Sequence, residues 1–258
     1  MPTTTTPDGV TIAFDATGEG PPLVLVHGIT ESRAAWDPLV PALSADHTVV
    51  AIDMRGHGES GDASSYDSRA MAVDIAAVVT ELGLDAPLVV GHSMGGIVAT
   101  AFGGAHPCRG VINIDQSIAL GDFQELVVGA EPLLRSDAFG EVITGLFDSM
   151  QGPLPPGEVA RIGALRRPVQ EVVLGVWAPL VELSPGDLQS LVDEMAAAVT
   201  APYLALFGID PGPDYPAWLT SVIPTATVEV WADTGHYPHL VHPQRFLDRL
   251  RSFEATLA

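Results

Sequence analysis

A serine enclosed by glycines is the first residue with the setting of a nucleophile. Ser93 lies in the sequence GHSMGG, after the apolar run 88–90 and before the helix-like segment 94–105. A sharp turn from strand to helix projects such a hydroxyl, and glycine is needed where nearby backbone leaves no room for a β-carbon. Amide groups at the start of the helix point at negative charge developing near the serine. The pattern predicts Ser93 as a nucleophile on an elbow-shaped turn.

Three histidines near the end of the chain could supply the base for this serine. A serine hydroxyl is a poor nucleophile unless an imidazole accepts its proton, and histidine is suited to this near neutral pH. His236 follows Gly235, just beyond an expected strand at 228–231, whereas His239 and His242 lie closer to the closing helix. Because a loop after that strand can reach back to the serine, we predict His236 as the base.

Two backbone amides are candidates for binding a negatively charged intermediate. Acyl transfer passes through an oxyanion, and each pre-oriented donor to it contributes about 3 kcal/mol. The expected strand 23–26 ends in His27 and Gly28, and Ile29 follows. We expect the amides of Ile29 and Met94 to form this oxyanion hole, and we expect His27 to hold the loop by hydrogen bonding.

Short apolar runs alternate with helical patterns over much of the chain. This alternation is typical of βαβ units, and continuous apolar strands indicate a sheet covered on both faces. Strands are expected at 11–14, 23–26, 48–52, 88–90, 111–114, 203–207 and 228–231. Helices between and after them are expected at 32–43, 68–82, 94–105, 215–222 and 243–258.

The strand pattern stops between residues 116 and 201. Helix-like segments take its place at 137–150, 156–165, 169–183 and 187–200. A stretch of this length is too long for one loop. We therefore expect residues 116–201 to form a helical cap inserted after the sixth strand, on a core of residues 1–115 and 202–258; helices packed directly on the sheet are the alternative.

Taken together, these motifs resemble those of the α/β-hydrolase superfamily. The resemblance spans nearly the whole chain outside the expected cap and rests on His27-Gly28, the segment DMRGHGES at 53–60, the turn at Ser93 and Gly235-His236. It implies the α/β-hydrolase fold, with a mostly parallel central sheet flanked by helices, and a serine hydrolase. The family's order of serine, acid and histidine is also met. An aspartate at the elbow would imply dehalogenase or epoxide-hydrolase chemistry, whereas serine implies acyl transfer through a covalent ester.

The acid that would orient His236 has two candidates. The family usually places it after the seventh strand, three residues beyond a glycine, but Asp210 stands only two residues beyond Gly208. Some similar proteins carry it at the end of the sixth strand, where Asp115 stands. We favour Asp115 and keep Asp210 as the alternative; either would hold the imidazole tautomer and stabilise the imidazolium.

Composition limits the partners and the location. The formal net charge is −21, and all 11 basic residues apart from histidine are arginine, so nucleic acid and anionic membrane are poor partners. Cys108 is the single cysteine, which excludes an intramolecular disulfide or a zinc site with paired cysteines. No apolar run reaches about 18 residues and residues 1–9 do not resemble a secretion signal, so we expect a cytoplasmic protein.

These observations predict a hydrolase for a small-molecule carboxylic ester or lactone, acting through an acyl-enzyme and without metal or cofactor. The expected cap contributes Met150 and Trp177, which favours a small to medium apolar substrate. C–C bond hydrolysis or hydroxynitrile-lyase-like cleavage on the same site, and a non-catalytic ligand-binding homologue, are the alternatives. The loop from Gly28 lacks the Gly-Pro-rich sequence common in the carbon-carbon hydrolases. The sequence leaves a homodimer open.

Overall fold

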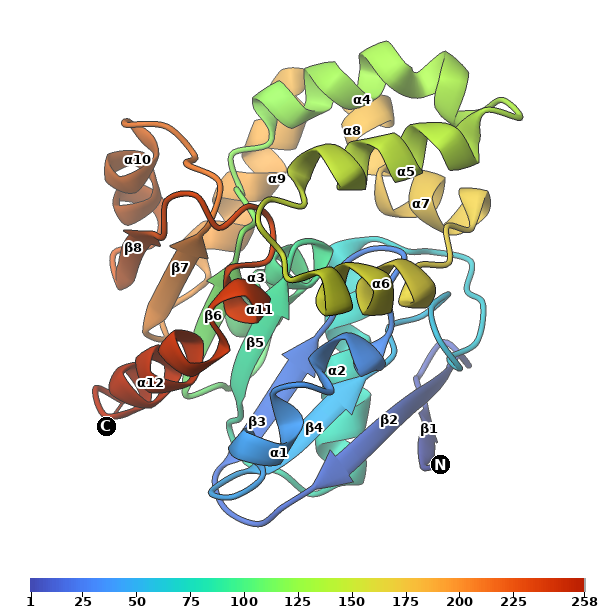
Figure 1. Ribbon diagram of the computed structural model, residues 1–258. Coiled ribbons are helices and arrows are strands. Elements are labelled where there is room, and N and C mark those ends of the chain that lie inside the picture. Colours follow the sequence, from blue (N-terminus) through green and yellow to red (C-terminus); the bar gives the residue numbers. More distant parts are fainter. Residues whose placement is uncertain (258) are drawn as a thin grey trace.

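One sheet forms the centre of the molecule (Figure 1). The computed structural model describes residues 1–257, and its strands in this range have the order β1-β2-β4-β3-β5-β6-β7-β8. Strand β1 pairs antiparallel with β2, and β2 with β4, whereas every neighbouring pair from β4 to β8 is parallel. The strands are β1 (Thr3–Thr5), β2 (Thr11–Thr17), β3 (Pro22–Val26), β4 (Thr48–Ile52), β5 (Leu88–His92), β6 (Gly110–Ile114), β7 (Tyr203–Phe207) and β8 (Ala226–Val230).

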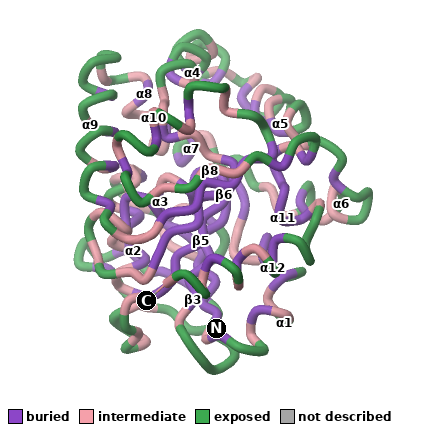
Figure 2. Tube along the Cα trace, turned by 90° about the vertical axis from the view of Figure 1, so that its left-hand side faces the viewer, coloured by how far each residue is buried: buried purple, intermediate pink, exposed green. Residues whose placement is uncertain are grey.

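Both faces of the sheet are covered by helices. In β3, Val24 and Val26 pack into the core beneath one helical layer, while Leu23 and Leu25 face the other, as the alternation of side chains along a strand requires. The buried central strands are enclosed by exposed helical surfaces (Figure 2). The first layer contains α2 (Ser68–Glu81), α3 (Met94–Ala105) and α10 (Tyr215–Val222), and the second η1 (Arg33–Trp36), α1 (Val40–Leu43) and α12 (Pro243–Glu254). The predicted sheet, mostly parallel and flanked by helices, is confirmed.

The chain segment that connects β6 to β7 forms a group of helices, which we call the cap helices. They form the upper part of the molecule in Figure 1. Residues of several of these helices line a cavity together with Ser93. The cap helices are α4 (Gly121–Leu134), α5 (Phe139–Met150), α6 (Pro156–Leu165), α7 (Gln170–Val176), α8 (Ala178–Glu182) and α9 (Pro185–Ala197). None of the helices within residues 1–257 is long and apolar enough to cross a membrane.

Prolines explain three of the differences from the expected elements. The single helix expected at 32–43 is divided into η1 and α1, with Pro41 in the first turn of α1. The helix expected at 169–183 is divided at Trp177, and Pro179 opens its second part. Helix α4 was not expected, because it carries Pro132 in its interior, a position that normally breaks a helix. The short helix α11 (Pro238–Val241) and the edge strand β1 were also missed.

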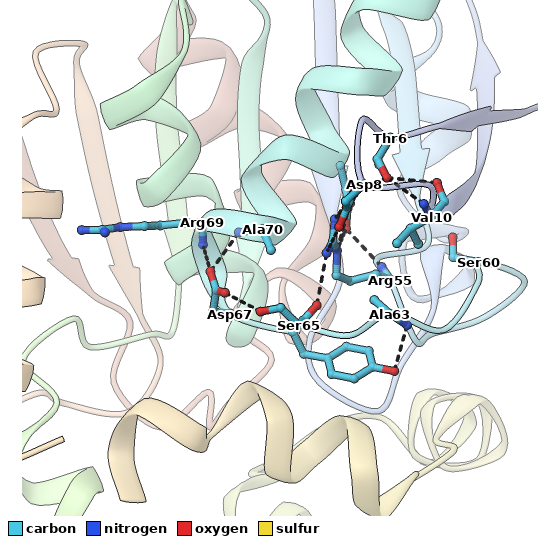
Figure 3. Close-up of polar contacts among 12 residues, drawn as sticks. Thr6, Asp8, Val10, Arg55, Ser60, Ala63, Ser65, Asp67, Arg69 and Ala70 are labelled. Atoms are coloured by element: carbon cyan, nitrogen blue, oxygen red, sulfur yellow. Dashed lines mark hydrogen bonds and ion pairs between the residues drawn. The ribbon is translucent and has the colours of Figure 1, made fainter. Parts of the chain in front are cut away.

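A buried arginine fixes the loop between β4 and α2 (Figure 3). The guanidinium of Arg55 donates from Nη2 to Asp74 on α2 over 2.6 Å, and from Nη1 to Asp8 over 2.9 Å. The Arg55 and Asp74 side chains are almost fully buried, whereas that of Asp8 is about half exposed. At the end of the loop, Asp67 caps α2 by accepting the amide hydrogens of Arg69 and of the following residue. The loop is thereby tied to the helix whose first turn reaches the cavity.

We expect Asp74→Asn to lower the free energy of unfolding by about 3 kcal/mol. The substitution keeps the shape but leaves the buried Arg55 charge with only a half-exposed partner, and breaking a buried pair is costly. Chemical denaturation measures the effect. Glu131→Gln is the control, because it breaks an exposed pair with Arg135 and should cost less than about 1 kcal/mol. An equal loss of unfolding free energy in the two variants would contradict the stabilising role of the Arg55–Asp74 pair.

Candidate active site

Ser93 occupies the turn between β5 and α3 with a φ of 54°. This conformation is strained for a residue with a β-carbon and costs about 1–3 kcal/mol. A β-carbon at Gly91 would overlap the carbonyl oxygen of Gly95, and one at Gly95 would overlap that of Val26. The two glycines are therefore required by close backbone contact, for the reason inferred from the sequence. Ser93 is 7% exposed and borders the cavity.

His236 lies in the loop after β8 and is held by Asp115, which follows β6. Its Nδ1 donates to Asp115 Oδ2 over 2.7 Å. The other carboxylate oxygen accepts the amide hydrogens of Gly208 and Ile209, which follow β7, over 2.7 and 2.9 Å. Asp115 itself has a φ of 52°. The ends of three strands thus fix one carboxylate and, through it, the imidazole ring.

The cap also holds the His236 loop. The amide of His236 donates to the carbonyl oxygen of Met150, at the end of α5, over 2.9 Å. A β-carbon at Gly235 would lie 2.6 Å from the Cα of Gly152, and both glycines have positive φ. The Phe147 ring from α5 also lies 6.5 Å from the His236 ring, centroid to centroid. The sequence did not indicate Phe147 as part of the site, because nothing local in a helical segment shows which residue will face a histidine far along the chain.

The proton positions on His236 suit a base. Burial lowers the pKa of His236, and the hydrogen bond to Asp115 opposes this effect. A neutral ring that donates from Nδ1 leaves Nε2 with a free lone pair, and within residues 1–257 this buried Nε2 has no hydrogen-bond partner. His236, Ser93 and Asp115 border the same cavity. The ring can therefore accept a proton at Nε2. Hydrogen bonds between a nucleophile and its base often shorten only when substrate binds.

Asp210 takes no part in holding His236. Its Oδ1 accepts the amide hydrogen of Gly212 over 2.9 Å and so closes a surface turn, although the residue borders the cavity. The amides of Gly208 and Ile209, which precede it, are directed at Asp115 instead. Of the two predicted acids, the structure brings Asp115 to the imidazole.

The residues predicted to donate to the oxyanion border the same cavity as Ser93. Met94 is the first residue of α3, where amide groups have no partner within the helix, and Ile29 follows β3; both border the cavity. A β-carbon at Gly28 would lie 3.3 Å from Cβ of Ser93, so this loop runs directly against the turn. His27 accepts the Met54 amide at Nε2 over 3.1 Å, which fixes the loop as inferred from the sequence.

The cavity has a volume of about 400 Å³ and a mostly apolar lining. Ile29, Met94 and Ile97 lie on the core side. The cap side is lined by large apolar residues that include Phe123, Phe147, Met150, Trp177 and Leu188. Among residues 1–257, no group of three or more His, Cys, Asp or Glu side chains is arranged to hold a metal ion.

Comparison with known proteins agrees with this architecture. A sequence model of the α/β hydrolase family matches residues 23–249, so the chain belongs to the α/β hydrolase family, and the fold expected from the sequence is confirmed. The chain is 41% identical to a soluble epoxide hydrolase of Corynebacterium sp. (strain C12) over 96 residues, 37% of this chain and 34% of that protein. The matched segment thus spans about a third of this curated relative.

Two solved structures are similar over nearly the full length. One is an N-acyl homoserine lactone degrading enzyme with 26% identity and a TM-score of 0.78, covering 98% of this chain and 100% of the other. The second is an esterase from Rhodococcus sp. ECU1013 with 25% identity and a TM-score of 0.74, covering 100% and 99%. The chain is thus similar to an esterase, a lactone-degrading enzyme and an epoxide hydrolase.

We expect Asp115→Asn to slow the reaction of Ser93 with a fluorophosphonate by about a thousandfold or more, because the amide would favour the wrong histidine tautomer. Asp210→Asn is the matched control and should change the rate by less than about threefold, since Asp210 only closes a turn. The rate constant of covalent labelling, followed by intact-protein mass, measures both effects. A loss confined to Asp210→Asn would contradict the assignment of Asp115.

Proposed function

We propose that this protein hydrolyses a carboxylic ester or lactone through an acyl-enzyme on Ser93. The observation that carries the proposal is the orientation of His236: its Nδ1 is bound to Asp115, and its buried Nε2 is without a hydrogen-bond partner in the described chain, at a cavity that Ser93 also borders. This arrangement supports the activation of Ser93 by His236.

In the first half of the proposed reaction, the Ser93 oxygen bonds to the carbonyl carbon while its proton passes to Nε2 of His236. The carbonyl oxygen becomes an oxyanion and accepts hydrogen bonds from the amides of Ile29 and Met94. His236 then returns the proton to the departing alcohol oxygen, and the carbon–oxygen bond breaks. Asp115 stabilises the imidazolium that exists between the two steps.

The second half repeats these steps with water as the nucleophile. His236 takes a proton from the water as its oxygen attacks the ester on Ser93, and the oxyanion forms again at the same amides. The proton then returns to the Ser93 oxygen as its bond to carbon breaks. The acid is released, and for a lactone the acid and the alcohol leave as one hydroxy acid. All atoms and protons are supplied by the substrate, water and these residues.

The cavity supports a small to medium apolar substrate. Its volume of about 400 Å³ and its lining, largely carbon, favour burial of an aliphatic or aromatic group. The net charge of −21 disfavours polyanionic substrates. The likeness to an esterase and to a lactone-degrading enzyme supports the same two substrate classes.

The relation to epoxide hydrolases is the main competing argument. The identity of 41% extends over only 37% of this chain, and the residue at the elbow is serine. A serine suits acyl transfer, whereas epoxide opening is associated with an aspartate at this position of the superfamily. Carbon-carbon hydrolysis, cyanohydrin cleavage and ligand binding without turnover also compete with ester cleavage. A covalent probe of Ser93 and a graded substrate series separate these activities.

We expect a fluorophosphonate to label the wild-type protein once and to leave Ser93→Ala unlabelled. Ser117→Ala is the matched control, because Ser117 also borders the cavity but its hydroxyl donates to the carbonyl oxygen of Ala119. This variant should be labelled like the wild type. Intact-protein mass spectrometry measures the stoichiometry. Equal labelling of Ser93→Ala and the wild type would remove the enzyme proposal.

We expect kcat/KM for p-nitrophenyl esters to rise about fourfold for each added acyl methylene until the cavity is filled. The reason is that each buried methylene contributes about 0.8 kcal/mol. A graded ester series, run beside panels of lactones and epoxides, measures this dependence. Turnover of epoxides alone, or values independent of chain length, would contradict the proposed substrate class.

A further inference from the structure

A second carboxylate lies buried close to His236 and takes no part in the proton transfers of ester hydrolysis. Glu31, in the loop after β3, is 3% exposed. Its Oε1 accepts the hydroxyl hydrogen of Tyr237 over 2.7 Å, and its Oε2 lies 3.8 Å from Nδ1 of His92. That Oε2 is buried and lacks a hydrogen-bond partner within the described residues. Burying a carboxylate costs free energy unless neighbouring groups compensate for the lost hydration. Such a position therefore indicates that the carboxylate has a role.

Glu31 is connected to two consecutive residues of the His236 loop, His236 and Tyr237. Tyr237, which binds it directly, follows His236 in the chain. His92, which precedes the nucleophile, donates from Nε2 to the carbonyl oxygen of His236 over 2.8 Å, and the rings of His92 and His236 lie 4.7 Å apart, centroid to centroid. Glu31 thus reaches the main chain of His236 through His92 and the next residue through a hydroxyl.

The same chain of contacts includes the cap. Arg166, directly after α6, donates to the Tyr237 hydroxyl over 3.1 Å. The amide of Arg167 donates to the carbonyl oxygen of Thr30 over 2.7 Å. The loop that carries Ile29, the His236 loop and the end of α6 therefore meet at Glu31.

The charge of Glu31 acts on the His236 ring. Burial raises the pKa of Glu31, but His92 and the Tyr237 hydroxyl outweigh it and bring the pKa to about 2, so the carboxylate remains ionised. Glu31 and Asp115 both favour the protonated form of His236, while burial and His92 disfavour it. The titratable groups around the ring are Asp115 after β6, His92 on β5, Glu31 after β3, Tyr237 and His239 on α11. The charged Arg166 after α6 binds the Tyr237 hydroxyl.

We propose that Glu31 is a positioning residue of the hydrolytic site: it fixes the His236 loop through His92 and Tyr237, and its negative charge stabilises the His236 imidazolium during the reaction. This role rests on the proposed ester or lactone hydrolysis. It differs from that of Asp115, because Glu31 touches neither the imidazole nitrogens nor the cavity that Ser93 borders.

We expect Glu31→Gln to lower kcat roughly tenfold, with KM within about twofold of the wild type. It should also move the acid limb of the profile of kcat/KM against pH to lower pH by about half a unit or more. The sign follows because removal of a negative charge lowers the pKa of His236, so that the neutral base persists to lower pH. Glu31→Asp, which keeps the charge, should restore the position of the limb. Tyr237→Phe, which keeps the charge but removes one hydrogen bond, should leave it in place.

A second variant provides a shift of opposite sign, which covers the case in which Glu31→Gln does not fold. His92→Gln retains an amide that can donate to the His236 carbonyl oxygen but removes the ring that disfavours the imidazolium. Its acid limb should therefore move to higher pH as long as Glu31 stays ionised, because His92 also holds the pKa of Glu31 low. Thermal unfolding midpoints of all variants report on folding. An acid limb at the wild-type pH in each folded variant would overturn the proposal, whatever the change in kcat.

Histidine NMR separates failure of this proposal from failure of the proposed function. The ring Cε1–H signal of His236, assigned by its loss in His236→Gln, is followed against pH in the wild type and in Glu31→Gln, and requires no turnover. An unchanged titration would overturn the role of Glu31. A titration shifted to lower pH in a chain that no fluorophosphonate labels would support the effect of Glu31 on the ring and overturn the proposed hydrolysis.

Discussion

The hydrogen bond between His236 and Asp115 is the interaction on which the arrangement of the site depends. It joins residues separated by 121 positions and closes only because the sheet brings the ends of β6, β7 and β8 together. The two amides after β7 bind the second carboxylate oxygen, so Asp115 cannot turn away without losing three hydrogen bonds. The imidazole ring is therefore held in one orientation. A base needs such a fixed orientation so that its lone pair stays in position to accept a proton.

The sequence predicted correctly those elements that are determined by residues close to one another in the chain. The turn at Ser93 was predictable because Gly91 and Gly95 satisfy a steric demand within a few residues, and β4 and α3 were predicted with the boundaries observed. The choice between Asp115 and Asp210 could not be made with the same certainty, because it depends on where the amides at the end of another strand point. Helix α4 was missed because its proline obscures the helical pattern and tertiary packing overrides the local preference.

Buried charge is a recurring feature of this acidic chain. Arg55 and Asp74 are paired away from water beside α2, and Glu31 is enclosed near His236. Such groups rarely add stability compared with apolar residues of the same size, but removing one partner is costly. These groups instead fix the conformation of a loop: each holds a loop that borders the site, where an apolar contact would permit several loop conformations.

The close backbone contact between Gly152 and Gly235 ties the α5–α6 connection to the His236 loop, so that the two segments must move together. An insertion in this short connector would displace His236, even though the two segments are more than 80 residues apart in sequence. The turn between α4 and α5 carries the exposed Arg135 and Asp137, and no glycine of the described residues brings it against the His236 loop in this way. A change of length in the α5–α6 connection is therefore expected to displace His236, whereas the turn between α4 and α5 has, among the described residues, no glycine contact of this kind with the histidine loop.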